Sequence, residues 1–371
     1  MKRKVALIFG GRSVEHDVSV ITAMQVFANI DKKKNDVQPI YMKDGDFFAG
    51  CLDTLEAVRD FDVLKRKKVV LFAGEFFSIK KNAVKKYFKP DVALIACHGG
   101  EGEDGTLQAL LEYNGIPFTS PELLASSVCM DKDFAKQVFE SMCLNVLPYQ
   151  TVFKEEFDSD AEKVVFAIES FLSYPLIVKP ARLGSSIGIG VSKNRTELKE
   201  KLEVAFQFDD KVVVEDKLED FVEVNCAAFF DGNVVKVSRT EQPLSANDFL
   251  TFQDKYEQGG KLSGLTRVSP ANVGSLNLIV QAITERIYKD FDMNGVVRVD
   301  FLVDEKRNKV YVNEINTIPG SLAFYLFDVD FKTLIDIVID ASIKRKLRKI
   351  KHYGFKTEIL SRFSTGAKMI K

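Results

Sequence analysis

Two strand-like segments, residues 296–303 and 309–316, bring together carboxylates that could hold a metal ion. Polar and apolar side chains alternate along both segments, and a turn-forming stretch separates them, which is typical of a β-hairpin. A hairpin symmetric about residue 307 sets two pairs opposite each other on one face, Asp300 with Glu314 and Arg298 with Asn316. Facing carboxylates destabilise a sheet unless a cation lies between them, and carboxylate and amide oxygens suit Mg²⁺. The alternative is an exposed polar face with another strand register.

A glycine-rich stretch at residues 184–190 (GSSIGIG) could bind phosphate. It lies between two predicted strands and does not contain GxxxxGK followed by Ser or Thr, so it fits neither a Walker A loop nor a Rossmann fingerprint. Its backbone N–H groups, with the hydroxyls of Ser185 and Ser186, are suited to phosphate oxygens. Lys179 precedes it in an apolar strand, where a lysine needs an anionic partner, and phosphate is a good one. Taken alone, the stretch is equally consistent with a tight turn.

Two polar residues follow predicted strands near the N-terminus. Glu15 comes after the apolar run at residues 5–9 and the pair Gly10-Gly11, and His98 directly follows the apolar run at 92–97. In open α/β sheets, ligands bind beyond the carboxyl ends of the strands. Glu15 could there hold a substrate ammonium, and the alternative is an acid that favours a helix N-terminus. For His98 the alternative is a hydrogen-bonded loop histidine.

The elements that must position these residues alternate between strand and helix. Strands and helices are predicted in turn over residues 5–9, 18–26, 92–97, 106–114 and 116–119. This order favours an α/β fold with a parallel N-terminal sheet and right-handed crossovers. A helix is predicted over 122–143. Residues 245–269 are polar and weakly periodic, which is typical of a functional loop or of a disordered segment.

Composition limits the class of protein. The chain has 371 residues, of which 46% are hydrophobic and 28% charged, which excludes a disordered or collagen-like chain and predicts two or three packed units. Five cysteines are scattered without CxxC pairs, so a disulfide framework and a zinc site are not expected and a reducing compartment is favoured. The N-terminal apolar run is too short for a signal peptide or a membrane span. We therefore expect a cytoplasmic globular protein.

The formal net charge of -1 hides a basic C-terminal tail. Residues 344–371 carry ten Lys and Arg against one acidic residue, Glu358. Such a run can bind nucleic acid or an anionic membrane. The alternative, which we favour, is a solvated helix end followed by a loose tail, because basic residues suit a helix C-terminus. No nucleic-acid or membrane partner is expected.

Seven pieces of the sequence, in order and suitably spaced, together resemble the D-alanine–D-alanine ligase family of ATP-grasp enzymes. They are residues 10–19, 98–108, 130–132, 178–186, 255–256, 298–300 and 313–320. The resemblance runs from about residue 4 to about residue 340. It implies three α/β subdomains: an N-terminal parallel-sheet domain followed by a two-part ATP-grasp domain. The expected divisions are 1–121 for the N-terminal substrate domain, 122–230 for the central part with the glycine loop, 231–343 for the C-terminal part with a lid loop and metal site, and 344–371 for the basic tail.

The resemblance also implies a role for individual residues. Mg²⁺, or Mn²⁺ in its place, would be bound by Asp300, Glu314 and Asn316. ATP would be bound by Lys132, Lys179, Ser186 and Lys255 at its phosphates and by Glu215 and Glu223 at its adenine and ribose. Glu15 would bind the amine of the first substrate, linked by hydrogen bonds to Ser185 and Tyr256, and His98 is a further substrate-site candidate. Arg298 and the Gly320 N–H would stabilise the oxyanion.

The reaction implied is ATP-dependent joining of two D-alanines through an acyl phosphate, for peptidoglycan synthesis, by a homodimer. Alternatives are a ligase with another second substrate, such as D-serine or D-lactate, and a non-catalytic nucleotide-binding protein. The chain departs from the family after Gly320: Tyr325 stands where a serine that holds the second substrate's carboxylate is expected. We therefore expect the second-substrate site to bind D-alanine weakly or to prefer another partner. The alternative is that Tyr325 is a packing residue.

Overall fold

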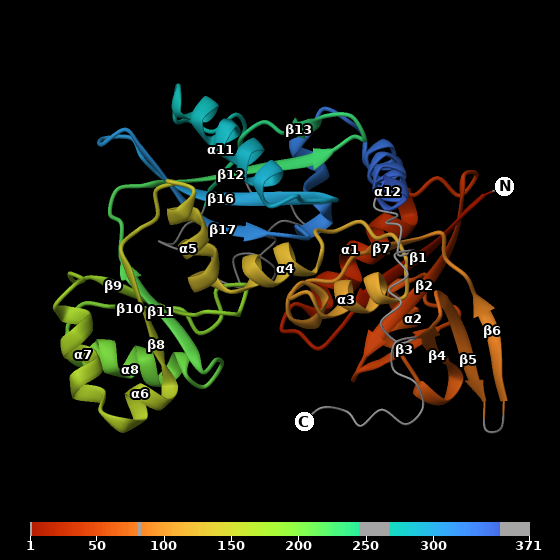
Figure 1. Cartoon of the computed structure of the whole chain (residues 1–371), viewed down its shortest axis with the longest axis horizontal. Helices are drawn as coiled ribbons and strands as arrows, with labels where there is room; N and C mark the ends of the chain where they lie inside the picture. Colours follow the sequence, from red (N-terminus) through yellow and green to blue (C-terminus); the bar gives the residue numbers. More distant parts are fainter. Residues whose placement is uncertain (1, 81–82, 245–266, 349–371) are drawn as a thin grey trace, which may run out of the picture.

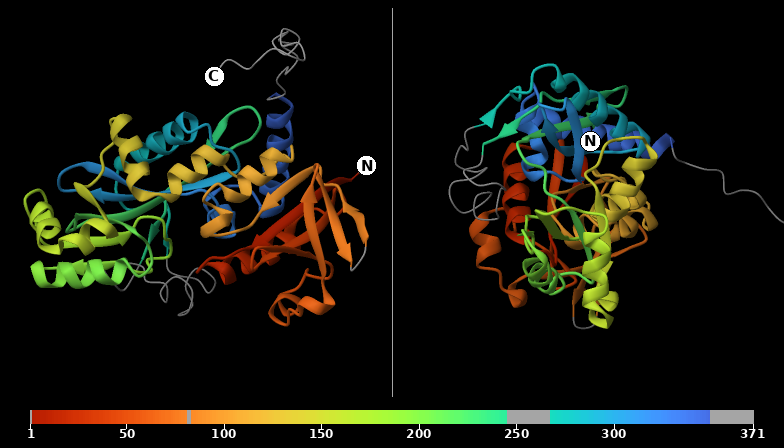
Figure 2. Two further views of the ribbon diagram at one scale, coloured as in Figure 1. Left: turned by 60° about the horizontal axis from the view of Figure 1, so that its bottom comes forward. Right: turned by 90° about the vertical axis from the view of Figure 1, so that its left-hand side faces the viewer.

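Three large sheets organise the computed structural model, which describes residues 2–80, 83–244 and 267–348. Figures 1 and 2 show the first sheet at one end of the molecule, the second at the other end, and the third joining them. The α/β fold class is thereby confirmed. Lys255, Tyr256, most of the predicted loop at 245–269 and residues 349–371 of the tail lie outside the described residues.

The first sheet is parallel only in part. Its strand order is β6-β5-β4-β3-β2-β1-β7, and β1 pairs in parallel with both β2 and β7. The parallel strands and the crossover helix are β1 (Arg3–Gly10), α1 (His16–Asn29), β2 (Asn35–Lys43) and β7 (Val92–Ile95). The antiparallel strands are β3 (Asp46–Ala49), β4 (Lys67–Phe72), β5 (Glu75–Lys80) and β6 (Ala83–Phe88).

The antiparallel half of this sheet was not predicted, although its turns carry a sequence signal. Asp44-Gly45 joins β2 to β3 with φ of 53° and 83°, and Ala73-Gly74 joins β4 to β5 with φ of 48° and 78°. Positive φ at both central residues is the geometry of a two-residue hairpin turn, and Asp-Gly is a favoured sequence for it. The short elements α2 (Leu55–Arg59) and η1 (Val63–Lys65) lie between β3 and β4.

The helical stretch after the first sheet differs from the prediction in two places. Residues 116–119 form only a single bridge, Ala93 with Phe118, instead of a strand. The helix predicted over 122–143 is two helices, α4 (Leu123–Met130) and α5 (Lys132–Ser141). The break is at Asp131, whose carboxylate accepts hydrogen bonds from the N–H groups of residues 133 and 134 and so caps α5. The loop before them contains η2 (Gly100–Gly102) and leads into α3 (Thr106–Tyr113).

The second sheet is antiparallel, in the order β10-β9-β11-β8. Its strands are β8 (Tyr149–Phe153), β9 (Leu176–Pro180), β10 (Gly190–Ser192) and β11 (Lys211–Asp216), and its helices are α6 (Lys154–Ser159), α7 (Ala161–Glu169) and α8 (Arg195–Ala205). The glycine stretch at 184–190 connects β9 to β10, as predicted. Apolar residues of α7 and α8 pack against β9 and β11 in one core.

The third sheet has the order β13-β12-β16-β17. Its strands are β12 (Val222–Phe230), β13 (Val235–Val237), β16 (Val296–Asp304) and β17 (Lys309–Asn316). The other elements of this region are β14 (Gln242–Pro243), β15 (Arg267–Val268), α11 (Leu276–Asp290), η3 (Gly320–Leu326) and α12 (Phe331–Arg348). The division predicted at residue 230 separates β12 from β16, whereas the structure pairs these strands over eight residues of register. The other predicted divisions stay predictions.

The β16–β17 hairpin has the predicted register where it carries the polar residues. Asp300 lies opposite Glu314, and Arg298 lies opposite Asn316. The turn, however, is displaced from residue 307, since Asp304 pairs with Lys309. A bulge between Asp300 and Phe301, at Asn313, restores the symmetric register. An extra residue in one strand corrects such an offset at the cost of a local bend.

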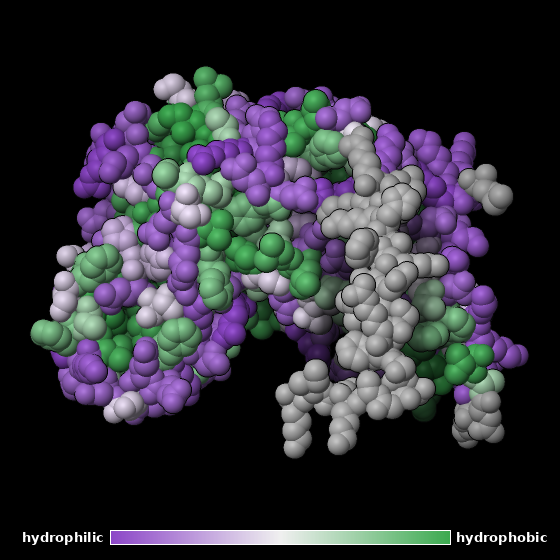
Figure 3. Space-filling model, viewed as in Figure 1, coloured by the Kyte–Doolittle hydropathy of each residue, from purple (hydrophilic) through white to green (hydrophobic). Residues whose placement is uncertain are grey.

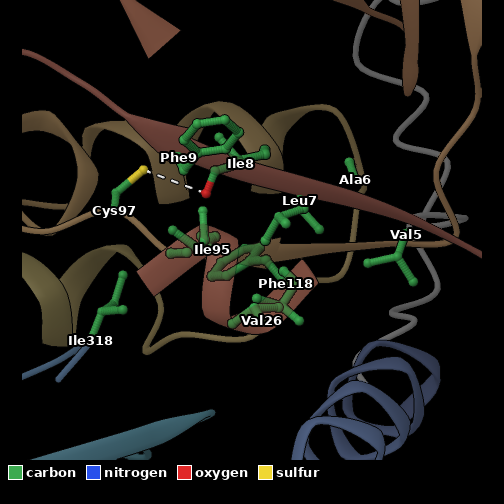
Figure 4. Close-up of a cluster of buried hydrophobic side chains, with 14 of the residues drawn as sticks. Val5, Ala6, Leu7, Ile8, Phe9, Val26, Ile95, Cys97, Phe118 and Ile318 are labelled. Atoms are coloured by element: carbon green, nitrogen blue, oxygen red, sulfur yellow. Dashed lines mark hydrogen bonds between the residues drawn. The ribbon is translucent and has the colours of Figure 1, made fainter. Parts of the chain in front are cut away.

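The first sheet has a dry core that includes parts of the C-terminal region. Residues 5–9 of β1 are fully buried, and Ile318 lies in the same cluster of apolar side chains (Figure 4). Residues of α12 such as Leu334 and Val338 complete this core. The segment that follows β17 is therefore fixed against the N-terminal sheet.

The surface is mixed, with limited apolar areas. Figure 3 shows hydrophilic side chains over most of one face and an apolar area over α4, where Leu124 is exposed. Among the described helices, none combines the length and the apolar character needed to cross a membrane.

Candidate active site

A pocket between the second and third sheets collects most of the predicted ATP-binding residues. Its volume is about 720 Å³ when the solvent at its open mouth is included. It is lined by Lys132, Ile177, Lys179, Leu183, Gly184, Ser186, Ile189, Leu218, Phe221, Glu223, Leu302, Asn313 and Glu314. The lining thus combines apolar side chains with two lysines and two carboxylates, as a bound purine nucleotide requires.

The glycine stretch is held over this pocket by Lys132. The Lys132 ammonium donates to the Leu183 carbonyl at 2.7 Å, and the Lys132 N–H donates to the Ala181 carbonyl at 3.0 Å. Burial lowers the pKa of Lys132, while the nearby Glu314 carboxylate acts in the opposite direction. Lys132 therefore connects the start of α5 to the loop and leaves its positive charge at the pocket wall.

Lys179 has its anionic partner inside the protein. Its ammonium contacts the fully buried Glu215 carboxylate and lies 3.3 Å from Asn313 Oδ1, and Lys136 lies 2.8 Å from the other Glu215 oxygen. Burial alone would raise the pKa of Glu215, but the two lysines outweigh it and lower the pKa to about 2. Glu215 is absent from the residues that line the pocket, so in this structure its carboxylate positions Lys179. No pattern in the sequence pointed to Lys136.

Glu15 lies where the N-terminal sheet meets the glycine stretch. The Ser185 hydroxyl donates to the Glu15 carboxylate, as predicted from the resemblance. A Cβ on Gly184 would lie 2.8 Å from a Glu15 oxygen, and one on Gly99 would lie 2.7 Å from it. Two loops therefore approach this carboxylate closely because both positions lack a side chain.

His98 is buried behind these loops. Its Nε2 lies 2.8 Å from the Thr22 hydroxyl, and the Ser321 N–H donates to the same hydroxyl at 3.3 Å. These contacts fit the alternative of a hydrogen-bonded loop histidine. They also connect α1 to the segment after Gly320, so His98 contributes to the shape of the site without itself lining the pocket described above.

The predicted metal ligands lie together near the open end of the hairpin, away from its turn. Asp300 accepts hydrogen bonds from Arg298 Nε at 2.6 Å and Nη2 at 2.7 Å, and from Asn316 Nδ2 at 3.0 Å. Arg298 therefore neutralises part of the repulsion between Asp300 and the opposed Glu314. Each carboxylate keeps lone pairs that these bonds do not use, and two carboxylates with an amide oxygen are a donor set that fits Mg²⁺.

Comparisons with known proteins agree with this arrangement. The family model described as D-ala D-ala ligase N-terminus matches residues 4–121, and the one described as D-ala D-ala ligase C-terminus matches residues 138–340. The chain belongs to the D-alanine–D-alanine ligase family. It is accordingly an ATP-dependent ligase.

Relatives cover nearly the whole chain. The D-alanine–D-alanine ligase of Thermosipho melanesiensis is 38% identical over 354 residues, covering 92% of this chain and 94% of the relative. That of Clostridium acetobutylicum is 35% identical, with coverage of 93% and 99%. Among solved structures, the VanG D-Ala:D-Ser ligase from Enterococcus faecalis has a TM-score of 0.78 at 30% identity, covering 92% of this chain and all of that one. The D-alanine–D-alanine ligase from Helicobacter pylori has a TM-score of 0.75 at 26% identity, covering 95% and 100%.

One residue of this ligase site was missed in the sequence. Glu103 is buried and accepts hydrogen bonds from the Gly99 N–H at 2.7 Å, the Ile318 N–H at 2.8 Å and the Thr317 hydroxyl at 3.1 Å. It therefore joins the loop of the N-terminal sheet to the segment between Asn316 and Gly320. Burial and the nearby Glu15 charge raise the pKa of Glu103 to about 7, although these hydrogen bonds act to lower it. The stretch at 98–105 contains three acidic residues, but which of them turns inward depends on contacts with distant residues.

The segment after the hairpin has an unusual backbone in this ligase. Ser321, Leu322 and Ala323 have φ of 53°, 50° and 44°, in the left-handed region that non-glycine residues rarely adopt. A Cβ on Gly320 would meet nothing within 4 Å, so the space beside its backbone is open. Tyr325 follows, and its hydroxyl is buried without a hydrogen-bond partner among the described residues. Strained backbone of this kind is concentrated at functional sites.

Proposed function

We propose that the chain joins D-alanine to a second D-amino acid, D-alanine in the first instance, with hydrolysis of ATP to ADP and phosphate. The observation that carries the proposal is the contact of Ser185 with Glu15. It connects the lysine-lined pocket between the second and third sheets to a carboxylate at the strand ends of the first sheet. One site thus combines groups suited to a nucleotide with a group suited to an amino acid.

The proposed reaction starts with the first substrate. Glu15 would hold the ammonium of this substrate. The carboxylate of the substrate would then point toward the γ-phosphate, which Lys132 and Lys179 would hold. Transfer of the phosphoryl group gives an acyl phosphate, and the amine of the second substrate attacks its carbonyl carbon. Arg298 and the Gly320 N–H would stabilise the negative oxygen of the tetrahedral intermediate, which collapses with loss of phosphate. Lysine charges suit this reaction because phosphoryl transfer depends mainly on positioning and charge neutralisation.

Asp300, Glu314 and Asn316 would hold Mg²⁺ at the phosphates. There the ion would neutralise charge on the phosphate oxygens. Glu223, which lines the pocket, is suited to contact the ribose hydroxyls. Glu215 would act through Lys179, because two lysines already engage its carboxylate.

A second candidate function differs only in the second substrate. Tyr325 occupies the position expected for a small hydroxyl residue, and a structural relative, the VanG enzyme, is a D-Ala:D-Ser ligase. D-serine or D-lactate in place of the second D-alanine would leave Glu15 and the ATP pocket in the same roles.

The test is phosphate release followed by product mass. Purified protein with ATP, Mg²⁺ and D-alanine should release phosphate, and the mass of the product should distinguish D-alanyl-D-alanine from the products of added D-serine or D-lactate. ATP binding without phosphate release for any of these substrates would instead support a non-catalytic nucleotide-binding protein.

We further propose that the dipeptide serves peptidoglycan synthesis and that the enzyme acts as a homodimer. Expression in a bacterium that lacks its own D-alanine–D-alanine ligase should restore growth. Sedimentation of the full chain should give the mass of two copies, and a single-copy mass at micromolar concentration would contradict the dimer.

A further inference from the structure

Three buried polar atoms without partners gather beside Arg298. They are Asn225 Oδ1, Glu241 Oε2 and the Tyr325 hydroxyl, each without a hydrogen-bond partner in the part of the chain that the structure describes. Buried polar side-chain atoms normally have a partner, and each exception needs an explanation. The Tyr325 hydroxyl can donate a hydrogen bond to a ligand, whereas Asn225 Oδ1 and Glu241 Oε2 can only accept one.

The position of these atoms is fixed by backbone pairing. The Asn225 N–H donates to the Glu241 carbonyl at 2.7 Å, and the Glu241 N–H donates to the Asn225 carbonyl at 2.9 Å. Asn225 lies opposite Asp300 in the register of β12 and β16, so both side chains face the same side of the sheet. Tyr325 and Glu241 are also close enough to Arg298 to act on its charge. Tyr325 and Glu241 therefore adjoin Arg298, one of the groups proposed to stabilise the oxyanion.

The Arg267 guanidinium covers the ring of Tyr325. Its guanidinium carbon lies 4.0 Å from the centre of the Tyr325 ring, and its Nε lies 3.3 Å from Glu241 Oε1. Within the described residues no other polar contact engages this guanidinium, whose side chain keeps 21% of its surface exposed. The remaining N–H groups are a planar fork of the kind that binds carboxylates in two-point contacts.

We propose that Arg267 and Tyr325 bind the carboxylate of the second substrate, in place of the serine that the family resemblance led us to expect. The Arg267 guanidinium provides the charge, the Tyr325 hydroxyl donates a hydrogen bond, and Glu241 positions Arg267. Burial raises the pKa of Tyr325, so its hydroxyl stays protonated and able to donate. The acceptor is then an α-amino or α-hydroxy acid with a free carboxylate. This inference rests on the proposed ligation of two substrates.

A competition in one tube tests this proposal. The enzyme receives ATP, Mg²⁺, D-alanine and D-alaninamide, whose carboxylate is replaced by a neutral amide. The ratio of D-alanyl-D-alanine to D-alanyl-D-alaninamide is measured by mass. The wild type should strongly favour D-alanine as acceptor. Arg267→Met should reduce this ratio at least roughly tenfold, the effect expected for one charge-assisted hydrogen bond.

Further variants separate recognition from packing. Arg267→Lys should restore part of the preference, because it restores the charge without the planar fork, and Tyr325→Phe should reduce the ratio less than Arg267→Met. Arg239→Met is the matched control, since the Arg239 side chain pairs with the exposed Asp328. It should leave the ratio unchanged. The ratio does not depend on how much of each variant is folded.

The outcomes distinguish this inference from the proposed function. An unchanged ratio in Arg267→Met, or a wild type that accepts the amide as well as the acid, would overturn the inference while ligation itself stands. Absence of both products and of phosphate release in the wild type would overturn the proposed function.

Discussion

At the scale of single residues, Glu314 provides the most direct test of the metal site. Glu314→Gln keeps the size of the side chain and removes one of two opposed charges, so the fold should keep its thermal midpoint. Turnover should fall at least about 100-fold, because a neutral amide is a poorer ligand for Mg²⁺ than a carboxylate. Phosphate release and thermal unfolding measure the two effects.

The matched control for Glu314 is Glu305→Gln, an exposed acid in the turn of the same hairpin. It should leave turnover within about twofold of wild type, as expected for a surface substitution. Full activity of Glu314→Gln would show that the opposed carboxylates do not form a metal site.

Glu103 makes stability depend on pH near neutrality. Burial, with Glu15 nearby, raises the pKa of Glu103 from its ordinary 4.5 to about 7. Between these values the folded protein binds more protons than the unfolded chain, so the free energy of unfolding should decrease as pH rises through this window. Denaturant midpoints across the window measure the slope. Glu103→Gln should flatten it, and a slope identical to wild type would assign the dependence to another group.

At the scale of elements, the glycine stretch depends on its close approach to α1. Gly184→Ala would place a Cβ 2.8 Å from a Glu15 oxygen, so the loop or the carboxylate must move. We expect the KM of the first substrate to rise roughly tenfold or more, with a smaller change in the KM of ATP, because a displaced Glu15 loses its contact with the ammonium.

The control for Gly184 lies in the same stretch. Gly190→Ala would meet the side chain of Lys201, which is flexible and can move. It should change both KM values by less than about threefold. Equal effects of the two substitutions would indicate a general disturbance of the loop instead of a specific contact with Glu15.

At the scale of the whole molecule, the last described helix is fixed to the first strand. Arg3 and Lys34 both bind the Asp336 carboxylate, at 2.6 and 2.7 Å, and Arg345 binds Asp292 at 2.7 Å. These contacts hold α12 in place as far as its last turn, and none of them involves a residue beyond 348. Deleting residues 352–371 should therefore leave ligation and the thermal midpoint nearly unchanged. A large loss of activity in a folded truncation would show that the tail contributes to the site or to a dimer contact.

Much of the fold and the reaction class was predictable because the relevant signals are local. The alternation of side chains over 296–316 defines two strands, and their polar faces require Asp300 and Glu314 to lie together. Even so, the turn was placed wrongly and the register was right only because the bulge at Asn313 corrects it. A bulge depends on how a strand packs against its neighbours, and the sequence pattern alone does not contain that information.

The sequence by itself determined the α/β class, the glycine stretch between strands and the ordered motifs that place the chain in its family. Only the tertiary structure decided which partner each buried charge has. Ser185 meets Glu15 across 170 positions, and the Ile318 N–H meets Glu103 across 215. Lys179, expected to need an anionic partner, contacts Glu215, and Arg267 covers Tyr325. The periodicity of the sequence shows that a polar side chain faces inward. Which group becomes its partner depends on how distant elements pack, because a buried charge is stable only beside the particular group that neutralises it.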